Sequence, residues 1–65
     1  MNLQNYYDHY VYVVCTDERV FRGYVTCCFS ADENEDGRES IIVDTDNSEA
    51  VELYGDDISV IRILR

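Results

Sequence analysis

The segment DENEDG, residues 32–37, carries the side chains best suited to chemistry in this sequence. Its first, third and fifth positions are Asp, Asn and Asp, and a glycine follows at the sixth, as in the front half of an EF-hand calcium loop. Position twelve of such a loop needs a bidentate carboxylate, but Val43 stands there, so an EF-hand is excluded. Two alternatives remain, which are a weak, looser Ca²⁺ site and an acidic turn that needs no metal. The oxygen ligands of the looser site would be Asp32, Asn34 and Asp36, with Glu39 or Glu33 completing the shell.

Other reactive residue types lack the partners that catalysis requires. His9 is the only histidine, and its chain neighbour Asp8 would point away from it on a helix. The cysteines, Cys15, Cys27 and Cys28, are odd in number and match neither a disulfide framework nor a zinc site. We therefore expect no catalytic residues, and we expect the cysteines to be small buried residues of a cytoplasmic protein.

The charge is high and unevenly placed. The 65 residues carry a formal net charge of -9, and all five basic residues are Arg. Eleven carboxylates and one Arg fall in residues 30–57, a net charge of -10, so the remainder carries +1. Such a field repels double-stranded DNA and attracts cations or a basic protein. Single-stranded nucleic acid could still bind through a few local contacts.

Composition and hydropathy indicate one small globular domain, residues 1–65. Hydrophobic residues make up 46% of the chain, which favours a packed fold over an acidic disordered tail. No apolar run approaches the ~20 residues of a membrane span, and the first residues do not resemble a signal peptide. We therefore expect a cytoplasmic protein with no membrane contact.

Residue periodicity predicts a short helix followed by five strands. Residues 2–10 place apolar and aromatic side chains at helical spacing behind Asn2 as N-cap. This helix and the start of the next strand carry four tyrosines, Tyr6, Tyr7, Tyr10 and Tyr12. Their rings either pack against the domain or in an oligomer interface, or they form a surface that binds a ligand. The alternating strands are expected at residues 11–16, 19–29, 41–43 within the stretch ESIIVDTD, 50–54 and 58–64.

The second predicted strand is long and has a glycine in its middle. Gly23 marks a bulge or a strong bend, as a small barrel needs. The alternation predicts an inner face made of Phe21, Val25, Cys27 and Phe29. Short consecutive strands with no room for crossover helices pair antiparallel and, with a bent second strand, predict a small β-barrel over residues 11–65.

Two stretches resemble the motifs of the Sm and Sm-like (LSm) proteins, in a divergent form of bacterial or phage type. RVFRGYV, with Gly23 at its centre, is similar to the first motif, and LYGDDISVI is similar to the second. The resemblance covers residues 11–63 and implies a strongly bent, five-stranded SH3-like barrel. It also implies a ring-shaped homo-oligomer in which the fourth strand of one copy pairs with the fifth strand of the next.

The family resemblance further implies that single-stranded, uridine-rich RNA binds around the pore. Gly55 and Asp56 match the second motif, but Tyr54 stands where the family usually has Arg, and Phe29 stands where the first motif has Asp. Asn34 lies one position later than the family Asn. The RNA-contacting residues implied by the match are Phe29, Asn34, Tyr54, Gly55 and Asp56.

Three hypotheses for function follow. The first is a non-enzymatic Sm-like binding module that forms a homo-oligomer and binds single-stranded RNA. The second is an acidic inhibitor whose face of residues 30–57 imitates a phosphate backbone and binds a basic protein. The third is a structural domain stabilised by weakly bound calcium, with no other cofactor.

Overall fold

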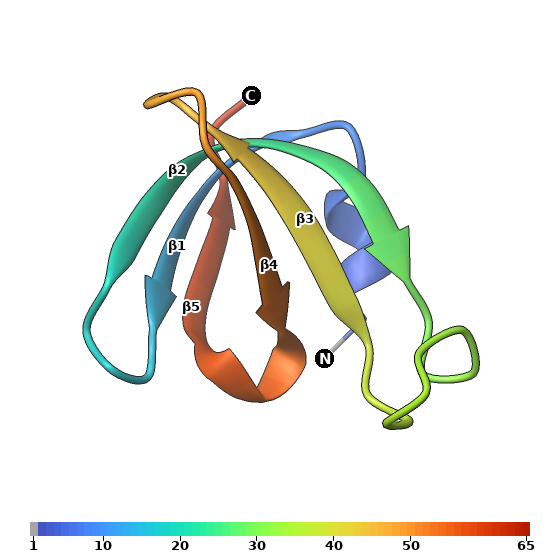
Figure 1. Cartoon of the computed structure of the whole chain (residues 1–65). Helices are drawn as coiled ribbons and strands as arrows, with labels where there is room; N and C mark the ends of the chain where they lie inside the picture. Colours follow the sequence, from blue (N-terminus) through green and yellow to red (C-terminus); the bar gives the residue numbers. More distant parts are fainter. Residues whose placement is uncertain (1) are drawn as a thin grey trace.

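The computed structural model describes residues 2–65 and shows one five-stranded antiparallel sheet with two short 3₁₀ helices (Figure 1). The elements are η1 (Leu3–Tyr6), β1 (Tyr10–Cys15), β2 (Val20–Phe29), β3 (Ser40–Thr45), β4 (Ala50–Tyr54), η2 (Gly55–Asp57) and β5 (Ile58–Ile63). In space the strands follow the order β4-β3-β2-β1-β5. The prediction of a mainly β fold with five antiparallel strands is confirmed.

The two outermost strands, β4 and β5, leave the sheet open. β4 pairs with β3, β5 pairs with β1, and no pairing joins β4 to β5 within residues 2–65. η2 connects the two edge strands, and β2 arches over the molecule (Figure 1). The described chain is therefore a curved sheet with two free edges, and the barrel closure predicted from the sequence is not present in it.

The arch of β2 has two causes. Gly23 is buried, and a Cβ atom at this position would lie 2.1 Å from the carbonyl oxygen of Asp44 on β3. The glycine is therefore needed because two backbones approach each other closely. The β-bulge lies further along, since the register with β3 shifts between Val25 and Cys27.

The bulge reverses the alternation at the end of β2. Cys27 was expected on the inner face but is exposed, while Cys28 is half-buried and packs against the core. Cys15 on β1 is buried, as predicted. The expectation that all three cysteines are buried is therefore wrong for Cys27, because one extra residue in a strand turns every later side chain to the opposite face.

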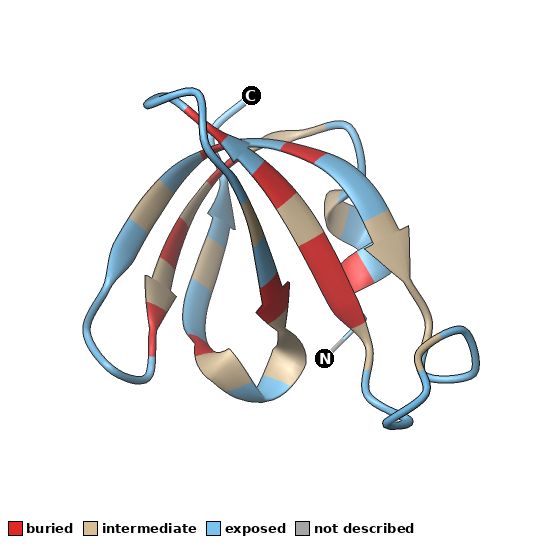
Figure 2. Ribbon diagram, viewed as in Figure 1, coloured by how far each residue is buried: buried red, intermediate tan, exposed pale blue. Residues whose placement is uncertain are grey.

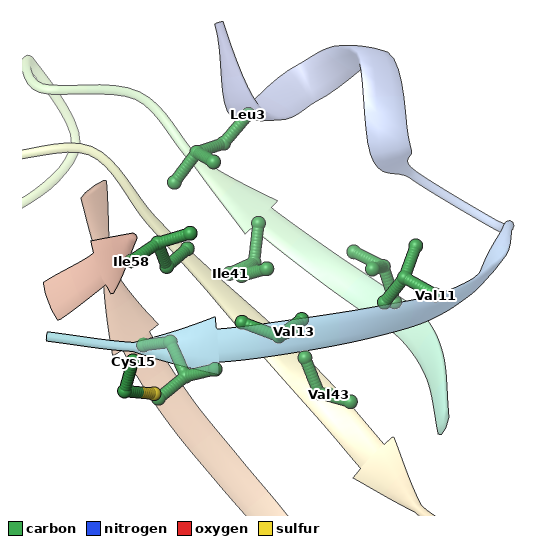
Figure 3. Close-up of a cluster of buried hydrophobic side chains, with 9 residues drawn as sticks. Leu3, Val11, Val13, Cys15, Ile41, Val43 and Ile58 are labelled. Carbon is green, nitrogen blue, oxygen red and sulfur yellow. The ribbon is translucent and has the colours of Figure 1, made fainter. Parts of the chain in front are cut away.

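The core lies on the concave side of the sheet. Buried residues alternate with partly exposed ones along β1, and they cluster on β3 (Figure 2). Their side chains converge beneath η1, which contributes Leu3 (Figure 3). The nine buried hydrophobic residues are Leu3, Val11, Val13, Cys15, Val25, Ile41, Val43, Leu53 and Ile58. Burial of each aliphatic side chain of this size stabilises the fold by about 1.5–3 kcal/mol relative to exposure.

The N-terminal helix is shorter than predicted. Asn2 caps it as expected, since its side chain accepts a hydrogen bond from Gln4 N at 3.2 Å. The helix ends at Tyr6 and β1 already begins at Tyr10, so the prediction of a helix over residues 2–10 is wrong. Asp8 has a φ of 66° and its N–H donates to Val25 O at 2.8 Å, which ties this segment to the sheet instead of to another helical turn.

Candidate functional site

The β2–β3 loop, residues 30–39, is hydrogen-bonded to the first residue of β3. Asn34 holds it there, because its Nδ2 donates to the carbonyl oxygen of Arg38 and to Ser40 Oγ, the latter at 3.1 Å. Ser40 is fully buried and donates in turn to Glu52 Oε2 on β4 at 3.0 Å. Asn34 therefore closes the loop on itself through Arg38 and fastens it to the sheet through Ser40.

Arg38 stands at the end of this loop and reaches across to η2. Its Nη2 lies 2.9 Å from Asp36 Oδ2, and its Nη1 lies 3.5 Å from Asp56 Oδ2. Its guanidinium carbon lies 4.1 Å from the ring centroid of Tyr54, a cation–π distance. The loop and the segment that follows β4 are therefore joined by a cation that stacks on an aromatic ring.

The charges around Arg38 reinforce one another. The hydrogen bond to Asp36 raises the pKa of the Arg38 guanidinium. Partial desolvation acts to raise the pKa of Asp36, but hydrogen bonds from the side chain and backbone of Arg38 outweigh it and the pKa is lowered. The pKa of Tyr54 is raised, first by the negative charge of Glu52. These pKa shifts favour the charged forms of Arg38 and Asp36 and the neutral form of Tyr54.

A hollow of about 370 Å³ lies between the loop and η2. Its lining is Ala31, Gly37, Arg38, Glu39, Gly55 and Asp56. None of these six residues carries a thiol, hydroxyl or imidazole. Gly37 has a φ of 71°, which a side chain would disfavour. The hollow therefore places a guanidinium that stacks on Tyr54 beside the carboxylates of Glu39 and Asp56.

The candidate calcium ligands have separate partners or point separately to solvent. Asn34 and Asp36 make the contacts described above, and Glu39 Oε1 accepts a hydrogen bond from Leu3 N at 3.1 Å. Asp32 is exposed. Within residues 2–65 no group of three or more His, Cys, Asp or Glu side chains is placed to hold a metal ion. The hydrogen bonds of Asn34 and Glu39 and the ion pair of Asp36 with Arg38 account for the positions of these side chains.

The residues matched to the Sm motifs are only partly brought together. Tyr54, Gly55 and Asp56 lie at or beside the hollow, whereas Phe29 is half-buried at the end of β2, opposite Ser40. The sequence analysis did not identify Arg38 as a site residue, although Arg38 and Gly55 line the same hollow in the folded protein. One signal was available, since Arg38 is the only basic residue among the eleven carboxylates of residues 30–57.

Comparison of the chain with models of protein families, with curated proteins and with solved structures found no match. Among residues 2–65 there is no helix of the length and hydrophobicity that a membrane span requires.

Proposed function

We propose that the protein is a non-enzymatic binding module of the Sm-like type. Its copies associate through the β4 and β5 edges into a homo-oligomer, and the hollow beside Arg38 binds single-stranded RNA. The strand order carries this proposal, because β4-β3-β2-β1-β5 leaves free the two strands that the family resemblance pairs between neighbouring copies. The curved sheet, with Gly23 in the middle of a bent β2, is also what an SH3-like fold requires.

The β5 edge has the properties of an interface. Successive backbone N–H groups along an antiparallel strand point alternately toward one neighbouring strand and toward the opposite side. The N–H of Leu64 points toward β1, since it donates to Tyr10 O at 2.8 Å. The N–H of Ile63 therefore points away from β1. Ile63 is 47% exposed and Val60 is 38% exposed. A free edge with apolar side chains and no proline tends to pair with another strand.

Size favours association as well. A domain of about 60 residues buries only roughly 60% of the surface of its unfolded chain, so small domains gain stability from oligomerisation. Pairing β4 with β5 would satisfy both edges of every copy, because such a contact is heterologous and can close into a ring.

The Arg38 hollow suits a single-stranded nucleotide chain. Bases stack on exposed aromatic or guanidinium planes with about 1–3 kcal/mol each, largely without regard to sequence. Arg38 and Tyr54 already stack on each other at 4.1 Å, and Arg38 is 43% exposed in its side chain. The surrounding carboxylates weaken long-range attraction to phosphates, so binding should rest on local contacts and fall with rising salt.

The edge contact is tested by the mass of the protein in solution. We expect a multi-subunit mass for the wild-type chain and a smaller one for Ile63→Pro, because proline removes the outward N–H and is tolerated on an edge strand. The matched control is Ile63→Thr, which keeps the N–H and the β-branched shape. A mass of 7.6 kDa for the wild-type chain, or equal masses for the Pro and Thr variants, would contradict the edge contact.

The RNA site is tested by fluorescence anisotropy with a labelled uridine-rich oligonucleotide at low salt. Arg38→Gln should weaken binding about tenfold, roughly 1.4 kcal/mol. Arg19→Gln is the matched control, since Arg19 forms the same kind of local ion pair, with Asp17 at 2.7 Å, far from the hollow in sequence. Equal losses in the two variants would show that only overall charge matters.

An acidic module that binds a basic protein is the second candidate, and the exposure of the carboxylates favours it. Nine of the eleven carboxylates in residues 30–57 are exposed, and Arg38 is the only cation among them. If this function is correct, a lysine-rich peptide should bind with strong salt dependence while the RNA oligonucleotide does not bind. If RNA binds and the peptide does not, this candidate is rejected.

A further inference from the structure

Leu3, the first residue of η1, joins the N-terminal segment to two separate parts of the chain. Its side chain is only 1% exposed and points from η1 into the core (Figure 3). Its N–H donates to Glu39 Oε1 at 3.1 Å, and its carbonyl oxygen accepts from Cys28 Sγ at 3.6 Å. Leu3 is therefore bonded both to β2 and to the last residue of the β2–β3 loop.

These contacts of Leu3 reach the wall of the Arg38 hollow. Glu39 and Gly55 both line the hollow, and the N–H of Gly55 donates to Glu39 O at 3.1 Å. A Cβ atom at Gly55 would lie 3.6 Å from Glu39 Cγ and 3.9 Å from Leu3 Cδ1. Leu3 therefore packs against two residues of the wall without lining the hollow itself.

The N-terminal segment is attached to the sheet again at its other end. Asp8 N–H donates to Val25 O at 2.8 Å, and Val25 N–H donates to His9 O at 3.0 Å. Three of the four residues between Leu3 and Asp8 are exposed, and Tyr6 is half-buried against the core. Short segments with few buried contacts open at a lower free energy than the whole domain. When Leu3 is released, η1 can therefore leave the sheet while Asp8 and His9 stay bonded to β2.

We propose that η1 is a strap whose docking through Leu3 holds the hollow in its binding geometry, with Glu39 as the connecting residue. In the docked state the Leu3 N–H fixes the Glu39 carboxylate. In the open state Glu39 loses this donor and Gly55 loses its contact with Leu3, so this side of the hollow is free to move. A ligand in the hollow then binds the docked state more tightly and keeps the strap closed. The effect of the strap on RNA binding rests on the function proposed above.

Two cysteines distinguish opening of the strap from unfolding of the domain. Cys28 is half-buried and bonded to Leu3, whereas Cys15 is buried in the core. Burial raises the pKa of both thiols, so both should react slowly in the native state. Opening of the strap frees the Cys28 thiol, while Cys15 becomes accessible only when the sheet unfolds. Exposed Cys27 is replaced by Ser in these experiments so that it does not react.

The first experiment needs no ligand and measures the rate at which iodoacetamide modifies Cys28, by mass spectrometry. Glu39→Ala removes the acceptor of the Leu3 N–H and should raise this rate about fivefold or more. The negative charge of Glu39 also contributes to the raised pKa of Cys28, so the matched control is Glu39→Gln. This control removes the same charge but keeps an oxygen that can accept the hydrogen bond, and its rate should rise less.

Two outcomes of this experiment would overturn the strap. One is an equal Cys28 rate in the Ala and Gln variants, which would show that the bond to Leu3 does not hold η1 in place. The other is modification of Cys15 together with Cys28, which would show that the whole domain unfolds instead of the N-terminal segment.

The second experiment tests the coupling to the hollow with the labelled uridine-rich oligonucleotide. At saturation the oligonucleotide should slow the modification of Cys28 about fivefold, and Leu3→Ala should weaken oligonucleotide binding by up to the same factor, because coupling between two sites is reciprocal. The Cys28 rate is measured with strap and hollow intact, so this result does not depend on whether Leu3→Ala folds. Binding of the oligonucleotide with an unchanged Cys28 rate would overturn the coupling. If the oligonucleotide does not bind, the proposed function fails, and the Glu39 variants alone decide whether the strap exists.

Discussion

Replacing Gly23 by alanine should destabilise the fold more than any other glycine substitution in the chain. A Cβ atom at Gly23 would lie 2.1 Å from Asp44 O, 2.7 Å from Asp44 C and 2.7 Å from Thr45 Cα. All three are backbone atoms of β3, so no side-chain rotation can relieve the overlap. The two central strands would have to separate, which weakens their hydrogen bonds and the packing of Val25 and Val43 beneath them.

The expected cost is about 3 kcal/mol or more, at the upper end of the range for overpacked sites. The total free energy of unfolding of a 65-residue domain is only about 3–10 kcal/mol, and 1 kcal/mol shifts Tm by about 4–8 °C at this size. Gly23→Ala should therefore lower Tm by at least about 12 °C or prevent folding.

The assay is thermal and urea denaturation followed by circular dichroism, with Gly55→Ala as control. The nearest atom to a Cβ at Gly55 would be 3.6 Å away, an ordinary van der Waals contact. The free energy of unfolding of Gly55→Ala should therefore lie within about 1 kcal/mol of the wild-type value. If Gly23→Ala melts within a few degrees of Gly55→Ala, the close approach of β2 and β3 is refuted.

Four further predictions concern the loop and the cysteines. Asn34→Ala should reduce the free energy of unfolding by about 1–2 kcal/mol in urea, while Asn47→Ala, in an exposed turn, should not. The backbone N–H of Ser30 donates a hydrogen bond to Glu33 and lowers the pKa of this carboxyl below its ordinary 4.5. Tm should therefore stay constant above pH 4.5 and fall as the pH drops through the pKa of folded Glu33. Glu33→Gln should make this fall in Tm smaller. Calcium and EDTA should leave Tm unchanged, and a rise of Tm with calcium would support a Ca²⁺ site in the loop. An alkylating reagent should modify exposed Cys27 in the native protein but buried Cys15 only on unfolding; equal rates would contradict these placements.

The strands were predictable from the sequence because local alternation and turn chemistry agree with the final packing. Val25 on β2 belongs to the buried core, as the alternation of that strand predicts. The open edges were not predictable, since strand closure depends on curvature that no local pattern specifies. Gly23 predicted a bulge or bend in this strand, but the register shift lies after Val25, where no residue type marks it, and it reversed the prediction for Cys27.

The candidate site was predictable only in part. The Asp, Asn and Gly residues of the loop correctly indicated a turn, but their spacing cannot tell whether the oxygens converge on a metal or bind elsewhere. In the structure Asn34 binds Ser40 and Asp36 binds Arg38. The Arg38–Tyr54 stack joins a residue of the β2–β3 loop to the last residue of β4, and the two meet only because β3 and β4 pair, so only the fold places them together.

The most direct test of the central proposal is the mass of the wild-type protein and of Ile63→Pro, measured by light scattering coupled to size-exclusion chromatography. We predict a multi-subunit assembly for the wild type, a clear loss of mass for Ile63→Pro, and wild-type mass for Ile63→Thr. A wild-type mass of 7.6 kDa, the mass of one chain, would contradict assembly through the β4 and β5 edges.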